Sequence, residues 1–263
     1  MADAAIKYEV DARGVATVTL SRPDIHNAFD DTVVAALSEA FAAAAEDASV
    51  RALVLASTGK SFCAGGDLNW MRRMAQYGYE ENLRDSNLLA EMLRRLNTLP
   101  KLTIARVQGA AYGGGVGLVS CCDIAIAAPE AAFCLSEVKV GMIPATISPY
   151  VINAIGERAS RRYFTTAELI SAEKARELGL VTELVPSAEE LDSAIDGILR
   201  SVLRNGPRGV GEAKRLILDY ANREIDAELI ADSSRRIAET RGSAEGQEGL
   251  TAFLEKRKPD WIG

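Results

Sequence analysis

The sequence predicts an α/β protein whose first two thirds alternate strands with helices and whose last third is helical. Continuous apolar runs of strand length stand at 51–57 and 101–109, as in strands buried on both faces of a parallel sheet. Stretches with helical periodicity lie between and after them. From about residue 187 only helical periodicity remains. These features indicate an α/β core followed by a helical region.

The first elements can be assigned from local signals. Residues 6–23 alternate apolar and polar side chains around the turn sequence DARG, which predicts a β-hairpin. Asp30 then stands where it can cap an alanine-rich amphipathic helix over 31–47. A loop, TGKSFCAGGDL at 58–68, and a helix from Glu80 to Asn97 separate the two buried strands.

The second half begins with short strands within 122–135 and then becomes helical. Three helical patterns, at 187–204, 207–221 and 224–257, end the chain, and we expect the last to break near Gly242. Amphipathic helices that follow a complete core usually bury their faces against another subunit. We therefore predict a homo-oligomer, with a core region at 1–197 and a helical oligomerisation region at 198–263.

Composition excludes several classes of protein. The formal net charge is −7 and the pI is near 5.0, whereas nucleic-acid binding depends on clustered lysine and arginine. No apolar run approaches the roughly 18–20 residues of a membrane span, and the first ten residues lack the pattern of a signal peptide. We expect a cytoplasmic protein that binds neither membranes nor nucleic acid.

Cysteine and histidine usage narrows the chemistry further. The four cysteines form no CxxC pair, so we predict neither a metal site nor disulfides and interpret them as small buried hydrophobic residues. Nucleophilic catalysis through a Ser-His-Asp or Cys-His arrangement would require the single histidine, His26. No GxSxG sequence occurs, and we interpret His26 as a loop residue bonded to its neighbours.

Two glycine-rich loops are the strongest signal for a functional site. FCAGGDL at 62–68 and YGGGVGLVS at 112–120 each follow a predicted strand and precede a predicted helix. The first N–H groups of a helix lack intrahelical partners, and glycine lets a ligand approach them closely. Two such groups converging on one carbonyl oxygen would form an oxyanion hole. The alternative is that the glycines only permit close strand-to-helix packing; neither loop fits a dinucleotide or P-loop motif.

A series of motifs gives the chain a family resemblance. In order, they are SRPDIHNAF, GKSFCAGGDL, VQGAAYGGGVGLVSCCDIAIAAPEAAFCLSEVKVGMIPA, ARELGLVTELVP and FLEKRKPDW. Together they resemble the enoyl-CoA hydratase/isomerase (crotonase) superfamily over nearly the whole chain. The resemblance implies a spiral of ββα units, a C-terminal helical trimerisation region, and a trimer or a hexamer built as a dimer of trimers. It also implies an acyl-CoA thioester substrate, so that coenzyme A is part of the substrate and no separate cofactor is expected.

The same resemblance assigns provisional roles to particular residues. The amides of Gly66 and Gly114 would form the oxyanion hole for the thioester. Residues near the adenine end of coenzyme A would be Ala64, Asp67 and Leu68. At the C-terminus, contacts to the adenine and the phosphates, including those bound by a neighbouring subunit, would come from Phe253, Lys256 and Lys258. A solvated basic tail is the alternative for these last three.

The carboxylates depart from the pattern of a common hydratase of this family, which uses two glutamates. The first glutamate position falls on Gly117, at the substrate site, and the second on Glu137. Partial burial would raise the pKa of Glu137 and suit it to proton transfer near neutral pH. A lone carboxylate suffices for the 1,3-proton shift of an enoyl-CoA isomerase. Hydration needs a further acid, which could be Tyr112, a bound water or a carboxylate of the substrate.

A narrower likeness favours hydration. GGGVGLVSCCDIAIA, CLSEVKVGMIPATISPYVI and IGERASRRYF resemble bacterial methylglutaconyl-CoA hydratases of leucine degradation and carboxygeranoyl-CoA hydratases of terpene degradation. Their substrates carry a distal carboxylate, which Arg72, Arg73 or Lys139 could pair. The hypothesis is reversible hydration of 3-methylglutaconyl-CoA to 3-hydroxy-3-methylglutaryl-CoA. The alternatives are an enoyl-CoA isomerase, a short-chain enoyl-CoA hydratase, and a non-catalytic acyl-CoA-binding protein.

Overall fold

A computed structural model gives the structure of residues 4–262. A six-stranded sheet with strand order β1-β2-β3-β4-β6-β9 forms its centre, and β1 is antiparallel to β2 while the other neighbours are parallel. A second sheet of three short strands has the order β5-β7-β8. The strands are β1 (Ile6–Val10), β2 (Val15–Leu20), β3 (Ala52–Ser57), β4 (Leu102–Val107), β5 (Ala111–Tyr112), β6 (Ile124–Ala127), β7 (Ala132–Cys134), β8 (Ile170–Ser171) and β9 (Glu183–Leu184).

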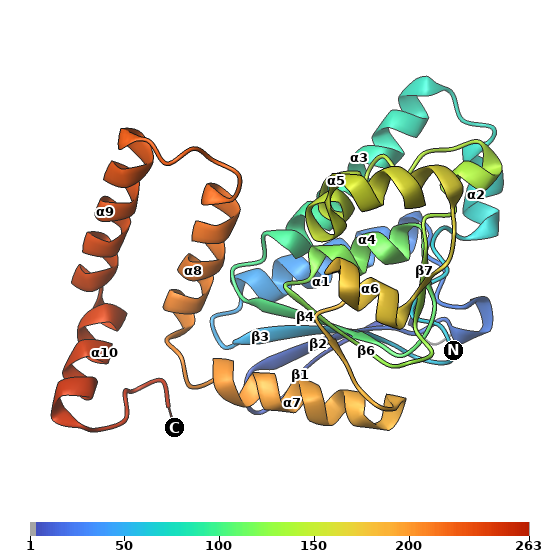
Figure 1. Cartoon of the computed structure of the whole chain (residues 1–263). Helices are drawn as coiled ribbons and strands as arrows, with labels where there is room; N and C mark the ends of the chain where they lie inside the picture. The colour runs from blue at the N-terminus through green and yellow to red at the C-terminus, as the bar shows by residue number, and fades with distance from the viewer. Residues whose placement is uncertain (1–3, 263) are drawn as a thin grey trace.

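Helices cover both faces of the large sheet, and three more project from it (Figure 1). One layer holds α1, α3, α4 and α5, and α7 lies on the opposite side of the sheet. The helices are α1 (Asp31–Glu46), α2 (Leu68–Met74), α3 (Tyr79–Asn97), α4 (Gly114–Cys121), α5 (Ser148–Thr166), α6 (Ala172–Leu178), α7 (Leu191–Val202), α8 (Pro207–Tyr220), α9 (Ala227–Gly242) and α10 (Ala244–Glu255).

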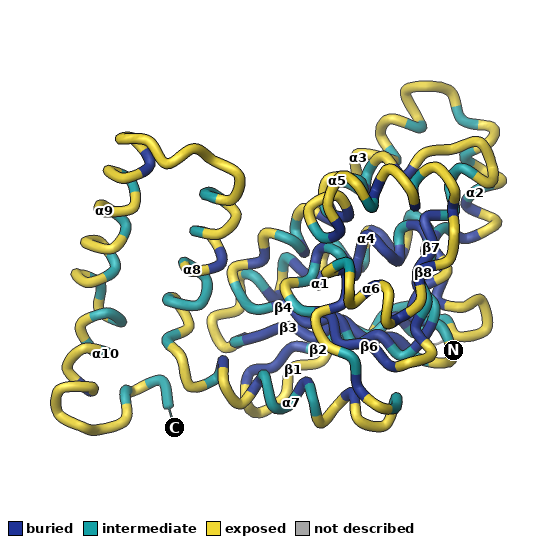
Figure 2. The backbone as a smooth tube through the Cα atoms, in the orientation of Figure 1, coloured by how far each residue is buried: buried dark blue, intermediate teal, exposed yellow. Residues whose placement is uncertain are grey.

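Burial is concentrated in the sheet and the helices packed on it (Figure 2). All six residues of β3 are buried, which agrees with the continuous apolar run predicted for a doubly covered strand. The larger apolar cluster joins β2, α1, α3 and α4. A second cluster under α7 includes Leu191, Ile195 and Leu199 together with Val54, Ile104 and Ile126.

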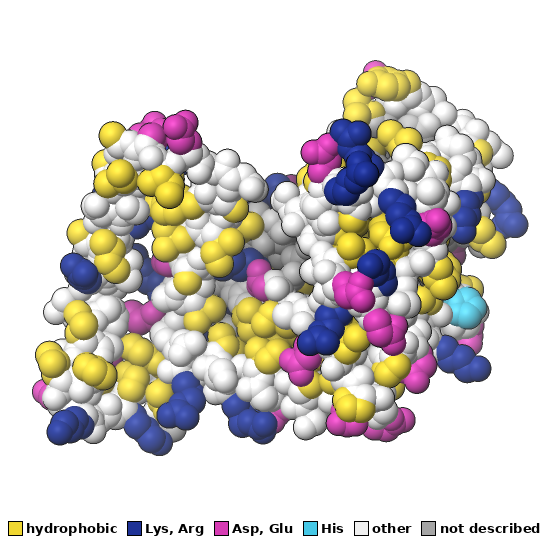
Figure 3. Space-filling model, viewed as in Figure 1, with side chains coloured by type: hydrophobic (Ala, Val, Ile, Leu, Met, Phe, Trp, Pro, Cys, Tyr) yellow, Lys and Arg dark blue, Asp and Glu magenta, His cyan; other side chains and the backbone are white. Residues whose placement is uncertain are grey.

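The C-terminal helices contrast with this core. In Figure 1, α9 and α10 stand away from the sheet and meet the rest of the chain through α8. The buried Lys214 of α8 pairs with Asp123 at 2.8 Å, and that carboxylate also accepts hydrogen bonds from Thr103. Large apolar side chains remain exposed on this extension, as the yellow patches of Figure 3 illustrate: Ile217, Leu218, Ile230, Ile237, Phe253 and Leu254.

Most predicted elements are confirmed. The hairpin forms, the Asp30 side chain accepts a hydrogen bond from Val33 N, and α9 ends at Gly242. The seventh helix begins at residue 191 instead of 187, because residues 188–190 form a 3₁₀ turn. The ninth begins at 227, because the Asp226 side chain caps it through Leu229 N. Within residues 4–262, none of the helices has the length and apolar character needed to cross a bilayer.

Candidate active site

Backbone pairing brings the two glycine loops together. Cys63 in the first loop forms a parallel bridge with Ala111 just before the second, and Tyr112 N donates to Cys63 O at 2.8 Å. A β-carbon placed on Gly65 would lie only 3.7 Å from Gly114 N. The two loops, about 50 residues apart in the sequence, are therefore held side by side by backbone pairing.

Each loop presents one amide that the backbone leaves free. Gly66 forms a parallel bridge with Phe29, in which Phe29 N bonds to Gly65 O and Asp67 N bonds to Phe29 O. In this pattern the N–H of the central residue points away from its bridge partner. Gly114 is the first residue of α4, so its N–H has no intrahelical acceptor. Among residues 4–262, neither amide donates a backbone hydrogen bond in a turn or loop.

Gly113 connects this amide pair to a carboxylate. The β5–β7 pairing places Tyr112 opposite Cys134, and Gly113 N donates to Cys134 O at 2.9 Å. Three residues further on, Glu137 starts the 3₁₀ turn Glu137–Val140. A β-carbon at Gly113, whose φ is +50°, would lie 3.1 Å from Glu137 Oε1. Glycine is therefore required at 113 both by the backbone angle and by the carboxylate beside it.

The environment of Glu137 suits proton transfer. Its side chain is half-buried, and Oε2 is buried without a hydrogen-bond partner among the described residues. Burial raises the pKa of Glu137 above its ordinary value, against a weaker opposing effect of its own backbone amide. Buried polar atoms without partners are rare in native proteins and commonly mark functional positions.

A cavity of about 390 Å³ collects these groups. Its walls come from the two glycine loops, from α2 and α3, and from the segment 136–147. Apolar side chains dominate the lining and a few polar groups converge on it, which is typical of a small-molecule site. Among the residues that line it are Ala64, Gly66, Trp70, Asp85, Gly114, Glu137, Lys139 and Ile147.

Several residues predicted for the site lie outside this cavity lining. Asp67 is 7% exposed, because its carboxylate caps α2 through Asn69 N and Trp70 N. Leu68 is exposed on the outside of α2, and Tyr112 is half-buried within β5. In Figure 1, α10 and the residues after it stand far from the glycine loops, so one chain does not bring its own 253, 256 and 258 to the cavity.

The space next to Gly117 is filled by the side chains of Ile147 and Leu93. A β-carbon there would lie 2.3 Å from Ile147 Cγ2 and 3.6 Å from Leu93 Cδ2. Ile147, which is 1% exposed, fills the space toward which a longer side chain at 117 would point. The structure thus has no room for the family's other glutamate at this position.

Of the three basic residues proposed to pair with a distal substrate carboxylate, Lys139 differs from Arg72 and Arg73 in its position relative to the cavity. Its side chain lines the cavity, with Nζ 3.9 Å from Cys134 Sγ. Arg72 instead donates to Asn69, and Arg73 pairs with Asp31 of α1. Neither arginine is among the described residues that line the cavity.

Sequence reasoning missed Asp85 and Trp70. Both line the cavity, from α3 and α2 respectively. Asp85 lies in a polar stretch of α3, EENLRDSN. From the sequence alone this stretch is typical of a solvent-exposed helix face, whereas in the structure Asp85 lines a cavity together with residues of α2. Trp70 is 4% exposed and its ring lies 6.0 Å from that of Phe29.

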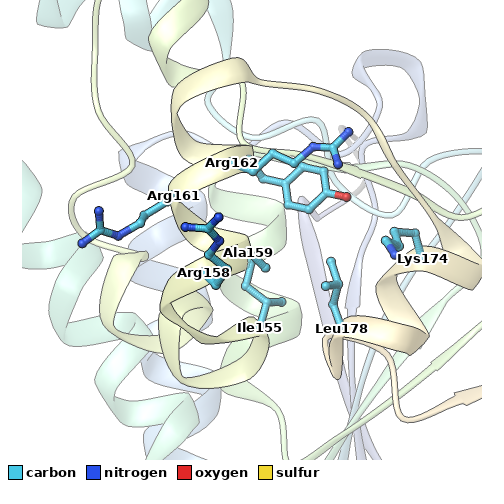
Figure 4. A pocket seen from close by; sticks show the side chains of 8 residues that line it. Ile155, Arg158, Ala159, Arg161, Arg162, Lys174 and Leu178 are labelled. Atoms are coloured by element: carbon cyan, nitrogen blue, oxygen red, sulfur yellow. The ribbon is translucent and has the colours of Figure 1, made fainter.

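A larger surface hollow of about 700 Å³ lies between α5 and α6 (Figure 4). Its charged lining residues are all basic, and three of them pair with neighbouring carboxylates: Arg161 with Glu157, Arg162 with Glu168 and Lys174 with Glu177. No carboxylate lines it, so this hollow lacks the kind of base that Glu137 supplies in the smaller cavity. The smaller cavity is therefore the candidate active site.

The histidine and the cysteines lie outside the lining of this cavity. His26 Nδ1 lies 3.0 Å from Ser61 Oγ, as expected for a loop residue bonded to its neighbours. Cys63, Cys121 and Cys134 are buried, and burial raises the pKa of Cys63 to about 12. Residues 4–262 contain no group of three or more His, Cys, Asp or Glu side chains that could hold a metal ion.

Comparisons with known proteins place this geometry in context. The pattern of the enoyl-CoA hydratase/isomerase family matches residues 11–263. A Thermus thermophilus protein, named provisionally as an enoyl-CoA hydratase, is 34% identical over 253 residues, 95% of this chain and 98% of its own.

Solved structures agree over the full fold. The enoyl-CoA hydratase from Shewanella pealeana is 44% identical with a TM-score of 0.95, covering 98% of this chain and 96% of that one. Pseudomonas aeruginosa AtuE is 36% identical with a TM-score of 0.93, covering 99% of this chain and 100% of that one. The predicted fold, an α/β crotonase-type spiral, is confirmed by this similarity.

Proposed function

The chain belongs to the enoyl-CoA hydratase/isomerase family, and from that premise we propose that it hydrates a branched, carboxylated enoyl-CoA reversibly. The substrate pair proposed is 3-methylglutaconyl-CoA and 3-hydroxy-3-methylglutaryl-CoA. The observation that carries the proposal is the position of Glu137 at Gly113, directly beside the amide pair of Gly66 and Gly114.

In the dehydration direction, the thioester oxygen accepts hydrogen bonds from Gly66 N and Gly114 N. The Glu137 carboxylate removes the proton from the carbon next to the thioester, and the resulting enolate is held by amides already in position. Preorganised donors of this kind stabilise the transition state by about 3–4 kcal/mol each. The hydroxyl at the next carbon then leaves as water, and hydration follows the same steps in reverse.

Lys139 supports a substrate that carries a distal carboxylate. It is the one of the three proposed cations that lines the cavity, and an ammonium group there would pair with a carboxylate at the far end of the acyl group. Substitution Lys139→Met should raise KM for 3-methylglutaconyl-CoA while leaving crotonyl-CoA, which lacks that carboxylate, nearly unchanged. Equal effects on both thioesters would remove Lys139 from substrate selection.

The decisive test compares thioesters with and without a distal carboxylate. Wild type should hydrate 3-methylglutaconyl-CoA, and Glu137→Gln should lower kcat on the order of 10²-fold or more, because the variant lacks the base. Arg72→Met serves as a matched control, since that side chain lies outside the cavity. Hydration by Glu137→Gln at the wild-type rate would rule out this role for Glu137.

An enoyl-CoA isomerase is the second candidate, favoured by the closed position at Gly117 and the single glutamate beside the amide pair. An isomerase moves the double bond of a 3-enoyl-CoA without adding solvent oxygen. Incubation in H₂¹⁸O distinguishes the two reactions, because only hydration places ¹⁸O in the product.

Assembly is a separate part of the proposal. The exposed apolar side chains of α8–α10, among them Ile237 and Phe253, support packing against other subunits in a trimer or a hexamer. In that assembly Lys256 and Lys258 would contact the coenzyme A of a neighbouring site. Light scattering should give a mass three or six times that of one chain, and Ile237→Glu should lower it.

A further inference from the structure

Hydration through Glu137 alone requires one carboxyl to carry the same proton between the α-carbon and the hydroxyl oxygen, and a separate acid for the hydroxyl removes that requirement. The departing hydroxyl must be protonated to leave as water, and the family's position for that acid is occupied by Gly117. Ile147 and Leu93 close the space in front of Gly117. An acid for this step must therefore project into the cavity from another element.

Asp85 is the acid that meets this condition. Among residues 4–262, the carboxylates that line the cavity are Glu137, from the 3₁₀ turn, and Asp85, from α3. Leu89, one turn further along α3, also lines the cavity, so Asp85 and Leu89 share the face of α3 that borders the cavity. The side chain of Asp85 is half-buried.

Trp70 lines the cavity near Asp85. The indole Nε1 is buried and has no hydrogen-bond partner among the described residues, and its proximity opposes the rise that burial causes in the pKa of Asp85. The same indole lies beside the first glycine loop, where a β-carbon on Gly66 would be 3.8 Å from Trp70 Cε3. Trp70 thus lies between the first glycine loop and Asp85 of α3.

The burial of Asp85 favours its neutral form. Burial and, to a smaller extent, the carboxylate of Asp31 raise the pKa of Asp85, while Trp70 and the guanidinium of Arg73 oppose this. Arg73 is already paired with Asp31, which limits its effect. The protonated fraction of Asp85 at a given pH is therefore larger than that of a free aspartate, as an acid catalyst requires.

We propose that Asp85 is the second proton-transferring carboxylate of this site and acts on the hydroxyl of the acyl group while Glu137 acts on the neighbouring carbon. The proposal rests on the proposed hydration. In dehydration, Glu137 takes the α-proton, the C–O bond breaks, and the proton of neutral Asp85 joins the hydroxyl to form water. Glu137 ends protonated and Asp85 ionised, and solvent exchange restores both. Hydration uses the reverse transfers.

Two reactions of the same enzyme separate this role from a structural one. The first is dehydration of 3-hydroxy-3-methylglutaryl-CoA, which needs both acids. The second is exchange of the α-protons of butyryl-CoA in D₂O, which needs Glu137 and the amides but has no leaving group. Asp85→Asn should slow dehydration about 100-fold or more while exchange stays within about threefold of wild type. Glu137→Gln should abolish both.

Controls and pH dependence complete the experiment. Asn87→Ala, at an exposed residue of α3 outside the cavity lining, should leave both reactions unchanged, and Asp85→Glu should recover part of the dehydration rate. The kcat/KM of wild type should fall at high pH as Asp85 ionises, and Asp85→Asn should lose this limb. The groups that face Asp85 are Asp31 from α1, Trp70 and Arg73 from α2, and Glu137 and Lys139 across the cavity; all are unchanged in the variant.

Two outcomes overturn the assignment. One is dehydration by Asp85→Asn within about threefold of wild type. The other is an equal fall of dehydration and exchange, which would mean that the substitution disturbs the whole cavity. A wild type that exchanges butyryl-CoA protons but hydrates none of the enoyl-CoA thioesters would instead overturn the proposed function.

Discussion

The two glycine loops each give one amide to the same cavity, but the space around their glycines differs. In the loop at 112–117, a β-carbon on Gly114 would lie 2.3 Å from Phe29 Cζ, and one on Gly115 would lie 2.5 Å from Cys63 O. In the loop at 62–68, a β-carbon on Gly66 would meet its nearest atoms at 3.8 Å.

This difference separates two reasons for glycine. Gly66 owes its free amide to the bridge with Phe29, which any residue in extended conformation could form. Gly114 and Gly115 are needed because neighbouring groups already occupy the positions of their β-carbons. In the second loop, glycine is therefore needed for close packing as well as for the proposed approach of a ligand to the amide. At Gly66, packing would also accept a residue with a β-carbon.

The largest effect is expected at Gly114. Gly114→Ala should reduce the free energy of unfolding by about 1–3 kcal/mol, because the Phe29 ring is buried and cannot move aside freely. Displacement of the amide should also lower kcat on the order of 10²-fold. Urea denaturation and kcat for an enoyl-CoA measure the two effects. Adding Phe29→Leu should recover stability, and a Gly114→Ala variant as stable as wild type would contradict the contact.

A substitution at Gly117 should affect stability more than turnover. Gly117→Ala places a methyl group 2.3 Å from Ile147 Cγ2, so we expect a loss of about 1–3 kcal/mol in unfolding free energy. Turnover per folded molecule should fall less than in Gly114→Ala, because Gly117 itself lies outside the cavity lining and only Ile147, which it would displace, belongs to it. Ile147→Ala in the same chain should restore part of the stability. Undiminished stability in the single variant would refute the close packing.

The pH dependence of kcat/KM tests Glu137, the carboxylate that lies beside Gly113 in the second glycine loop. The pKa of Glu137 is raised above 4.5 by burial, so this base takes up its proton at a higher pH than a free glutamate does. Below that pKa, kcat/KM in the dehydration direction should fall about tenfold per pH unit. Gly66→Ala should keep the same midpoint, since it leaves Glu137 untouched. A midpoint at or below 4.5 would show that Glu137 is not the group that titrates.

The smallest effect is expected at Gly66. Gly66→Ala should keep kcat/KM within about threefold of wild type, because its β-carbon meets only ordinary contacts and the amide direction is kept. Gly65→Ala is the matched variant: Gly65 has φ +87°, and its β-carbon would lie 2.9 Å from Tyr112 O. It should be clearly destabilised. If Gly66→Ala were as damaging as Gly114→Ala, the contrast between the loops would fail.

Local signals in the sequence were sufficient for much of the fold. The hairpin, the cap at Asp30, the fully buried β3 and both glycine loops follow from periodicity, turn chemistry and capping preferences. These features depend on residues close together in the chain, so they can be recognised without knowing the tertiary structure. The roles of Gly66, Gly114 and Glu137 stay predictions that rest on the family resemblance.

The remaining features depend on long-range contacts. Glu137 reaches Gly113 through the β5–β7 pairing, and these strands are only two and three residues long, too short to give a periodic pattern. Asp85 reaches the cavity because α2 lies beside α3, and its own neighbours in the sequence are polar. Ile147 could be recognised as the side chain opposite Gly117 only from the coordinates.

Ile147 also constrains how this chain could evolve. A mutation that introduced glutamate at 117 would meet the branched side chain at once, and a mutation that shortened residue 147 first would leave an empty volume in the interior. Either order passes through a less stable intermediate. A glutamate at 117 therefore requires a simultaneous change at 147, and single substitutions that alter the acid chemistry of this pocket would be tolerated more readily at other positions.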